Sequence, residues 1–182
     1  MDTKMKGMIM TAMVVLSLVL GLLAVLGSSW MTASEDGMDA NYSLTEVEVE
    51  ATVNGAAMTF EMDYGEACDE SEEDEACDLV TAGTIGTIGL WVGIAMAGLF
   101  ALMMILPMAG IDAMDGIPDV AQKLISWGAG GMMLLGAIGW LIMKPDMDDD
   151  AIGLGMSFFM AIIAGVLGLA ASAMGMLVKA DE

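Results

Sequence analysis

This chain of 182 residues contains no histidine, and its five basic residues are all lysines, so it contains no arginine either. Without imidazole side chains, histidine-based metal ligation and histidine-based acid–base catalysis are both excluded. Without guanidinium groups, the usual bidentate donor to phosphate is missing. The net charge of −21 also repels nucleic acid, so we expect no nucleic-acid partner.

Charged residues are also absent from four long runs, although 57% of the chain is hydrophobic. About 20 apolar residues cross a hydrocarbon core of about 30 Å as a helix. Lipid offers no partner for backbone N–H and C=O groups, so each run must satisfy its own hydrogen bonds. The sequence therefore predicts an all-α membrane protein, a bundle of four transmembrane helices that contacts the lipid bilayer. The predicted spans are residues 7–30, 79–108, 124–143 and 151–178.

The first run is longer than the apolar region of a signal peptide, which has about 7–15 residues. We therefore expect it to remain as a helix that anchors the chain. No run contains an ionisable side chain, whereas pumps and proton-coupled transporters place such groups within their spans. The chain also lacks a recognisable set of catalytic residues, so we expect a protein that is not an enzyme and needs no cofactor.

The lysines indicate which side of the membrane each connecting segment occupies. An even number of spans puts both termini on one side, together with the segment between the second and third spans. Four of the five lysines share that side and only Lys144 lies opposite, so the positive-inside rule makes that side cytoplasmic. The expected cytoplasmic segments are 1–6, 109–123 and 179–182, and the expected outer segments are 31–78 and 144–150.

The first outer segment contains a pattern typical of a β-hairpin. Residues 45–64 alternate between apolar and polar side chains, interrupted by Asn54-Gly55, a preferred dipeptide of a two-residue type I′ turn. Such a loop pairs Val49 with Phe60 and places the apolar side chains of both strands on one face. We therefore expect a small extracellular antiparallel β-sheet in this first outer loop.

An isolated hairpin with one apolar face is marginally stable in water. We expect this face to be covered by further strands from residues 31–43, by the outer helix ends, or by another subunit. The last of these would make the chain a homo-oligomer or the partner of another membrane protein.

The other face of the hairpin is acidic. Its cross-strand pairs place like charges opposite each other, which is unfavourable by up to about 1 kcal/mol per pair unless salt or a cation screens them. This face is either a solvated surface or one that gathers loosely bound cations or meets a basic partner. Its candidate residues are Glu46, Glu48, Glu50, Glu61 and Asp63.

The two cysteines, Cys68 and Cys77, both fall in the outer segment. Disulfides persist on the oxidising side of a membrane, so we predict that these residues pair, with two free thiols as the alternative. Two cysteines without histidine make only half a zinc site. The acidic stretch between them lacks EF-hand spacing, which favours a charged, mobile tip over a calcium site.

Trp30 and Trp140 lie at the expected outer ends of the first and third spans. Tryptophan is enriched at membrane–water interfaces, so we expect Trp30 to be an interface anchor. Small residues recur at every fourth position in two other spans, as at Gly89 and Gly93 and at Ala164 and Gly168. This spacing predicts close helix packing, within the bundle or against a neighbouring protomer.

The layout resembles the claudin, peripheral-myelin-protein and epithelial-membrane-protein superfamily. The matching features are four spans with both termini inside, a β-rich first outer loop that begins at Trp30, and the Cys68-x8-Cys77 pair. Where claudins carry Gly-Leu-Trp before the first cysteine, this chain has Asp63-Tyr64-Gly65. The resemblance implies a structural protein of the plasma membrane.

We therefore expect a non-enzymatic, claudin-like tetraspan protein that presents an acidic extracellular sheet for lateral or cell-surface protein contacts. An alternative is a subunit that lines a cation-selective path, with the acidic face as its vestibule. A further alternative is an accessory subunit of a larger membrane complex.

Overall fold

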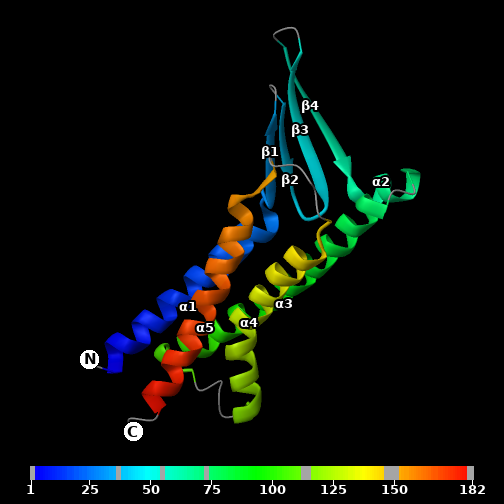
Figure 1. Ribbon diagram of the computed structural model, residues 1–182. Coiled ribbons are helices and arrows are strands. Elements are labelled where there is room, and N and C mark those ends of the chain that lie inside the picture. Colours follow the sequence, from blue (N-terminus) through cyan, green and yellow to red (C-terminus); the bar gives the residue numbers. More distant parts are fainter. Residues whose placement is uncertain are drawn as a thin grey trace.

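The computed structural model describes residues 3–35, 38–53, 56–71, 74–111, 116–145 and 152–179. In these residues four long helices lie side by side, and a narrow β-sheet projects beyond one end of them (Figure 1). The N-terminal end of the first helix and the C-terminal end of the last lie together at the opposite end (Figure 1). The elements are α1 (Thr3–Leu26), β1 (Met31–Glu35), β2 (Met38–Tyr42), β3 (Glu46–Val53), β4 (Ala56–Asp63), α2 (Tyr64–Ser71), α3 (Asp74–Met108), α4 (Asp119–Met143), β5 (Ile152–Leu154) and α5 (Met156–Lys179).

Four of these helices are long and apolar enough to cross a bilayer, which confirms the prediction of four long apolar helices. Large apolar side chains such as Leu23, Ile88 and Leu135 are exposed on their outer surfaces. Single exposed apolar side chains are common on proteins in water, but many of them along four helices suit a hydrocarbon environment. The spanning parts are Met5–Leu26, Ala76–Pro107, Asp119–Met143 and Met156–Met176.

The first and fourth predicted spans are shorter as helices than the sequence suggested. The run 7–30 is helical only to Leu26, and the run 151–178 begins with strand β5. The backbone carbonyls of Ser29 and Trp30 accept hydrogen bonds from the N–H groups of Ser157 and Gly155, both at 2.9 Å. These bonds tie the end of the first run to the start of the fourth and continue the β1–β5 ladder. Hydropathy alone did not distinguish this apolar β-structure from a helix.

The helices approach each other closely where small residues face one another. A Cβ atom added at Gly89 of α3 would lie 2.8 Å from the backbone nitrogen of Gly136 in α4. One added at Gly168 of α5 would lie 2.9 Å from the backbone nitrogen of Gly130 in α4. Real Cβ atoms do not come this close, so only glycine fits at these crossings. The small-residue patterns therefore serve packing within the bundle, one of the two alternatives that the sequence left open.

Serine hydroxyls add hydrogen bonds between the packed helices. Ser17 of α1 is fully buried and donates to the carbonyl oxygen of Ala164 in α5 at 2.6 Å. Ser172 of α5 donates to the carbonyl oxygen of Ser126 in α4 at 2.5 Å. Each bond satisfies a hydroxyl that would be costly to leave unpaired among apolar side chains.

The sheet has five antiparallel strands in the order β4-β3-β2-β1-β5. Val49 pairs with Phe60 and Glu48 pairs with Glu61, so the predicted hairpin register is confirmed. Strands β1 and β2 are the further strands expected from residues 31–43. The fifth strand was not predicted, because the run that contains it was assigned to the fourth span. Asn54 and Gly55, the predicted turn residues, lie outside the described residues.

Three aromatic side chains form a cluster where the sheet meets the helices. The ring centroids of Trp30 and Trp140 are 5.0 Å apart in an edge-to-face arrangement, and that of Phe158 is 6.1 Å from Trp30. The indole N–H of Trp30 donates to the carbonyl oxygen of Ala24 at 2.9 Å. Trp30 is fully buried. Trp30 is therefore a core residue, whose polar atom finds its partner inside the protein. Its expected role as an interface anchor stays a prediction.

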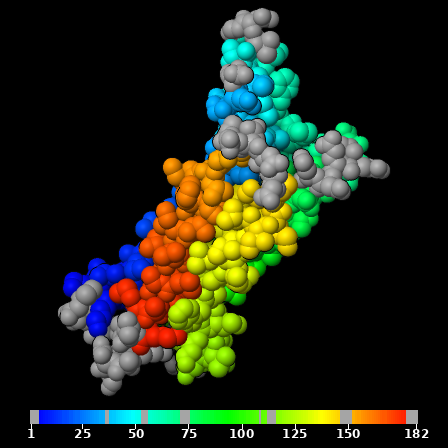
Figure 2. Space-filling model, in the orientation of Figure 1, coloured from blue at the N-terminus to red at the C-terminus, as the bar shows by residue number. Residues whose placement is uncertain are grey.

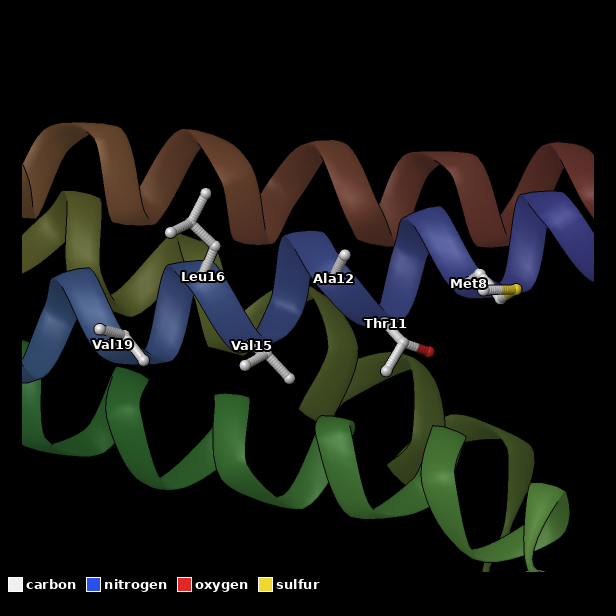
Figure 3. A pocket seen from close by; sticks show the side chains of 6 residues that line it. All are labelled: Met8, Thr11, Ala12, Val15, Leu16 and Val19. Atoms are coloured by element: carbon white, nitrogen blue, oxygen red, sulfur yellow. The ribbon is translucent and has the colours of Figure 1, made fainter.

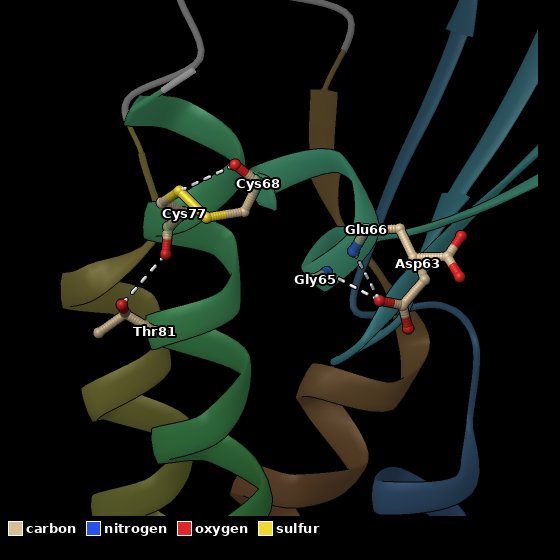
Figure 4. Close-up of a disulfide and its surroundings, with 6 residues drawn as sticks. All are labelled: Asp63, Gly65, Glu66, Cys68, Cys77 and Thr81. Atoms are coloured by element: carbon tan, nitrogen blue, oxygen red, sulfur yellow. Dashed lines mark hydrogen bonds between the residues drawn. A yellow bond between two sulfur atoms is a disulfide. The ribbon is translucent and has the colours of Figure 1, made fainter. Parts of the chain in front are cut away.

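Cys68 and Cys77 form the predicted disulfide, with their Cα atoms 4.9 Å apart. The bond joins the short helix α2 to the first turns of α3 (Figure 4). The acidic stretch between the cysteines was expected to be a mobile tip, but α2 continues to Ser71 and α3 begins at Asp74. Residues 72–73 of that stretch lie outside the described residues.

Candidate interaction surface

The projecting sheet has two chemically different faces, because successive side chains of a strand point in opposite directions. The register aligns the apolar residues of all five strands on one side of the sheet. The acidic residues other than Glu35, together with the serine and threonine side chains, occupy the other side. We refer to these as the apolar face and the acidic face.

The acidic face contains all five of the residues that the sequence singled out. Glu46 pairs with Asp63, Glu48 with Glu61, and Glu50 with Thr59. Two rungs of the β3–β4 ladder therefore bring carboxylates opposite each other, as predicted. Like charges in this position repel, so this face favours cations or basic groups in the solution beside it.

Strand β2 adds a carboxylate that the sequence reasoning missed. Asp39 lies opposite Glu50, and Asn41 lies opposite Glu48. These residues contribute to a shallow hollow of about 450 Å³ on the acidic face. The alternation of β2 is a recognisable signal, because polar side chains at Asp39 and Asn41 alternate with apolar ones. Only the sheet order shows that they extend the carboxylate ladder.

Asp63 has a structural role besides its place on this face. Its carboxylate accepts hydrogen bonds from the backbone N–H groups of Gly65, at 2.8 Å, and Glu66, at 3.2 Å (Figure 4). These N–H groups belong to the first turn of α2, where helical partners are lacking. Asp63 is therefore the N-cap that ends β4 and starts α2.

Among the described residues, no three carboxylate or cysteine side chains come close enough to hold a metal ion. The acidic residues are instead spread along strands β3 and β4 as successive cross-strand pairs. This arrangement is suited to a diffuse attraction for cations and provides no coordination shell.

The apolar face is covered only at its base. Met31 and Val47, next to the helices, are 1% and 6% exposed. Further out, Met38, Met58 and Phe60 are 52%, 50% and 59% exposed. Figure 2 shows this part of the molecule as a narrow projection beyond the helices. The expectation that further strands or helix ends cover the apolar face is therefore met only near the bundle.

Tyr64 holds the base of the sheet against the helices. Its side chain is buried, and its hydroxyl donates to the carbonyl oxygen of Ser43 at 3.5 Å. Burial raises the pKa of Tyr64 well above its usual value, and the nearby Tyr42 and Glu46 raise it further. The phenol therefore stays neutral, and the junction between sheet and bundle remains apolar.

The β4 edge of the sheet is also open. Strand β4 pairs only with β3, and all eight of its residues are exposed. An exposed edge strand presents unpaired backbone groups, and acidic side chains limit pairing with other chains. Here Glu61 and Asp63 provide such charges close to the open edge.

A second hollow, of about 520 Å³, lies along the outer side of α1 (Figure 3). Its lining is apolar except for Thr11, whose hydroxyl donates to the carbonyl oxygen of Gly7 at 3.0 Å. All of its lining side chains come from one face of this single helix. The lining residues are Met8, Thr11, Ala12, Val15, Leu16 and Val19.

Comparison with protein-family models gives no match for this chain, and comparison with curated proteins gives none either.

Proposed function

We propose that this chain is a non-enzymatic multi-pass protein of the plasma membrane that presents its two-faced sheet outside the cell for contacts with other proteins. The observation that carries this proposal is the apolar face, which is half-exposed over the part that projects beyond the helices. Monomeric soluble domains rarely leave a contiguous apolar surface of this kind open to water, and such surfaces mark sites of association.

The four apolar helices support membrane insertion, and the lysines support the orientation. In that orientation both termini lie in the cytoplasm and the sheet lies outside, where the Cys68–Cys77 disulfide is stable. The claudin-like relationship is part of the proposal. It is supported by the four-helix layout, the sheet in the first loop and the cysteine pair.

The orientation can be tested with single cysteines introduced at Thr59, on exposed β4, and at Lys123, near the start of α4. On intact cells an impermeant thiol reagent should label the cysteine at position 59 and leave that at position 123 unlabelled. The opposite pattern would overturn the assignment of the sheet to the outside.

The contact role is tested by placing a photoreactive phenylalanine analogue at Phe60, on the apolar face, in the full-length chain. The matched position is Glu61, its neighbour on the same strand, which faces the other way. Irradiation of intact cells should join position 60 to a protein and should do so much less from position 61. If neither position gives a protein adduct, the sheet is not a contact surface and the proposal fails.

The second candidate function is a subunit that lines a cation-conducting path. It is favoured by the carboxylate pairs Glu46–Asp63 and Glu48–Glu61, which would raise the local concentration of cations. It predicts cation-selective conductance of the purified protein in planar bilayers. The contact role predicts none.

A further inference from the structure

We propose that the apolar face docks on the same face of a second copy of this chain, so that two sheets form a β-sandwich outside the bundle. This inference rests on the proposed function and names the partner of that surface.

The chemistry of the face restricts the partner to an apolar surface. On all five strands the residues of this face are apolar or aromatic, except Glu35 at the outer end of β1. A second copy offers a surface of the same composition and size. Methionine is abundant on this face, with Met38, Met58 and Met62 all half-exposed, and its flexible side chain adapts to an opposing surface.

The charge distribution favours the same partner. Face-to-face packing leaves the acidic faces of both copies on the outside of the sandwich. Packed sheets lie about 10 Å apart, so the two acidic faces are further apart than the Debye length of about 8 Å at physiological ionic strength. The two copies therefore bury their apolar faces without bringing their carboxylate ladders together.

The available area is sufficient for a specific contact. The eight residues of β3 and of β4 span about 26 Å, and five strands span about 24 Å across. The large apolar side chains of this face, Met38, Met58, Phe60, Met62 and Leu154, are 39–59% exposed. At about 200 Å² for a fully exposed large side chain, about 500 Å² remains open in each copy. Two copies together bury about 1,000 Å², which is the size at which an interface becomes specific. Two chains held in one membrane also meet at a high effective concentration, which lowers the affinity that association requires.

The geometry of membrane anchoring is compatible with this packing. The strands run lengthwise along the projection, away from the helices (Figure 1). A two-fold axis along the membrane normal keeps both chains in the same orientation and brings identical faces together. The strands of the two sheets then stay roughly aligned, as in sandwiches whose sheets cross at about 30°.

The first test identifies what the photoreactive analogue at Phe60 captures. Two full-length copies with different tags are expressed together and irradiated, and mass spectrometry identifies the adduct. We expect a product that carries both tags, joined through the apolar faces. A product with another protein would overturn the second copy as the partner while leaving the contact role intact. A lipid adduct, or no protein adduct, would overturn both.

The second test measures association of fluorescently labelled chains in liposomes by energy transfer. The variant Met58→Thr with Phe60→Thr removes two large side chains but keeps a residue that favours strands. We expect it to associate about tenfold more weakly or worse, as when central apolar anchors of an interface are truncated. The control Ala57→Thr introduces the same residue on the same strand but on the acidic face, and should associate like the original chain.

Folding is checked in each variant through the Cys68–Cys77 disulfide and the circular dichroism of the sheet. Equal association of a folded double variant and the control would overturn the proposal, because the contact would then lie elsewhere, such as between helices. If the double variant does not fold, the identity of the adduct from position 60 decides whether the partner is a second copy.

Discussion

The rings of Trp30 and Trp140 meet edge to face, with centroids 5.0 Å apart, at the junction between the sheet and the helices. Trp30 follows α1 and directly precedes β1, whereas Trp140 belongs to α4. Their contact therefore connects the start of the sheet to a helix distant in the chain. Edge-to-face aromatic pairs contribute about 0.5–1.5 kcal/mol beyond the apolar area that they bury.

Trp30→Ala should destabilise the protein by about 3–5 kcal/mol, because it leaves a cavity beside Trp140 and Phe158. The measurement is thermal or denaturant unfolding in detergent. Trp127→Ala is the matched control, since Trp127 in α4 is 40% exposed and its loss leaves no buried cavity. An equal decrease in the free energy of unfolding in both variants would contradict the core role of Trp30.

Gly130→Ala should weaken the packing of α4 against α5. The added methyl group would lie 2.9 Å from the carbonyl carbon of Gly168, in contact with backbone that cannot turn away. The adjacent Gly131 has nothing within 4 Å of the corresponding position. Gly131→Ala should therefore leave stability unchanged or raise it by up to about 1 kcal/mol, through higher helix propensity. Unfolding of the two variants under one condition separates these effects.

Cys68→Ser should loosen the connection between α2 and α3 without expelling the helices from the membrane. A ring of this length restricts the unfolded chain by about 2.7 kcal/mol in the chain-entropy model. We expect faster proteolysis within residues 64–78, with the four helices still protected by lipid. Non-reducing mass spectrometry of the original chain should show Cys68 joined to Cys77 within one molecule. A bridge between two chains as the main species would contradict the structure.

Glu48→Gln with Glu61→Gln should stabilise the β3–β4 hairpin by up to about 1 kcal/mol, because it removes one pair of opposed carboxylates. The gain should shrink as salt is added, since salt already screens the pair. The measurement is stability against ionic strength, with conductance in a planar bilayer recorded in parallel. If the original chain conducts cations and this variant does not, the conducting path is favoured over the contact role.

Tyr64 should ionise well above pH 10, because burial raises its pKa. A raised pKa means that the fold favours the neutral phenol. Its contribution to stability is complete below about pH 10, the value in an unfolded chain, and is lost as the pH rises towards the folded value. When the pH is raised, the ultraviolet absorbance of tyrosinate should increase in two steps, and the step at higher pH belongs to Tyr64. The variant Tyr64→Phe should lack this step, whereas Tyr42→Phe should retain it. Ionisation of both tyrosines near pH 10 would show that the phenol of Tyr64 is not buried.

Much of the architecture follows from local signals in the sequence. Apolar runs without charge predict long helices, because only helices satisfy the backbone in lipid. The alternation of residues 45–64 gives one register, because a shift by one residue between the strands would place Val49 and Phe60 on opposite faces. Cys68 and Cys77 are the only cysteines, so a disulfide within the chain has a single pairing.

Other features depended on contacts between residues that are distant in the chain. Ile152–Leu154 reads as part of an apolar helix but pairs with β1. Just beyond it, the N–H groups of Gly155 and Ser157 donate to the carbonyl groups of Trp30 and Ser29. The hydropathy of a short run does not reveal whether the run is surrounded by lipid as a helix or pairs with the edge strand of a sheet.

The sequence by itself determined the four long helices, the hairpin register and the separation of acidic from apolar side chains, because each depends on residues that are neighbours in the chain. Only the tertiary structure decided that Trp30 is buried, that Asp39 extends the carboxylate ladder, and that Phe60 remains open to solvent. Burial is a property of what lies opposite a side chain in space. For Trp30 that is Trp140, whereas Phe60 is 59% exposed because no described residue covers it.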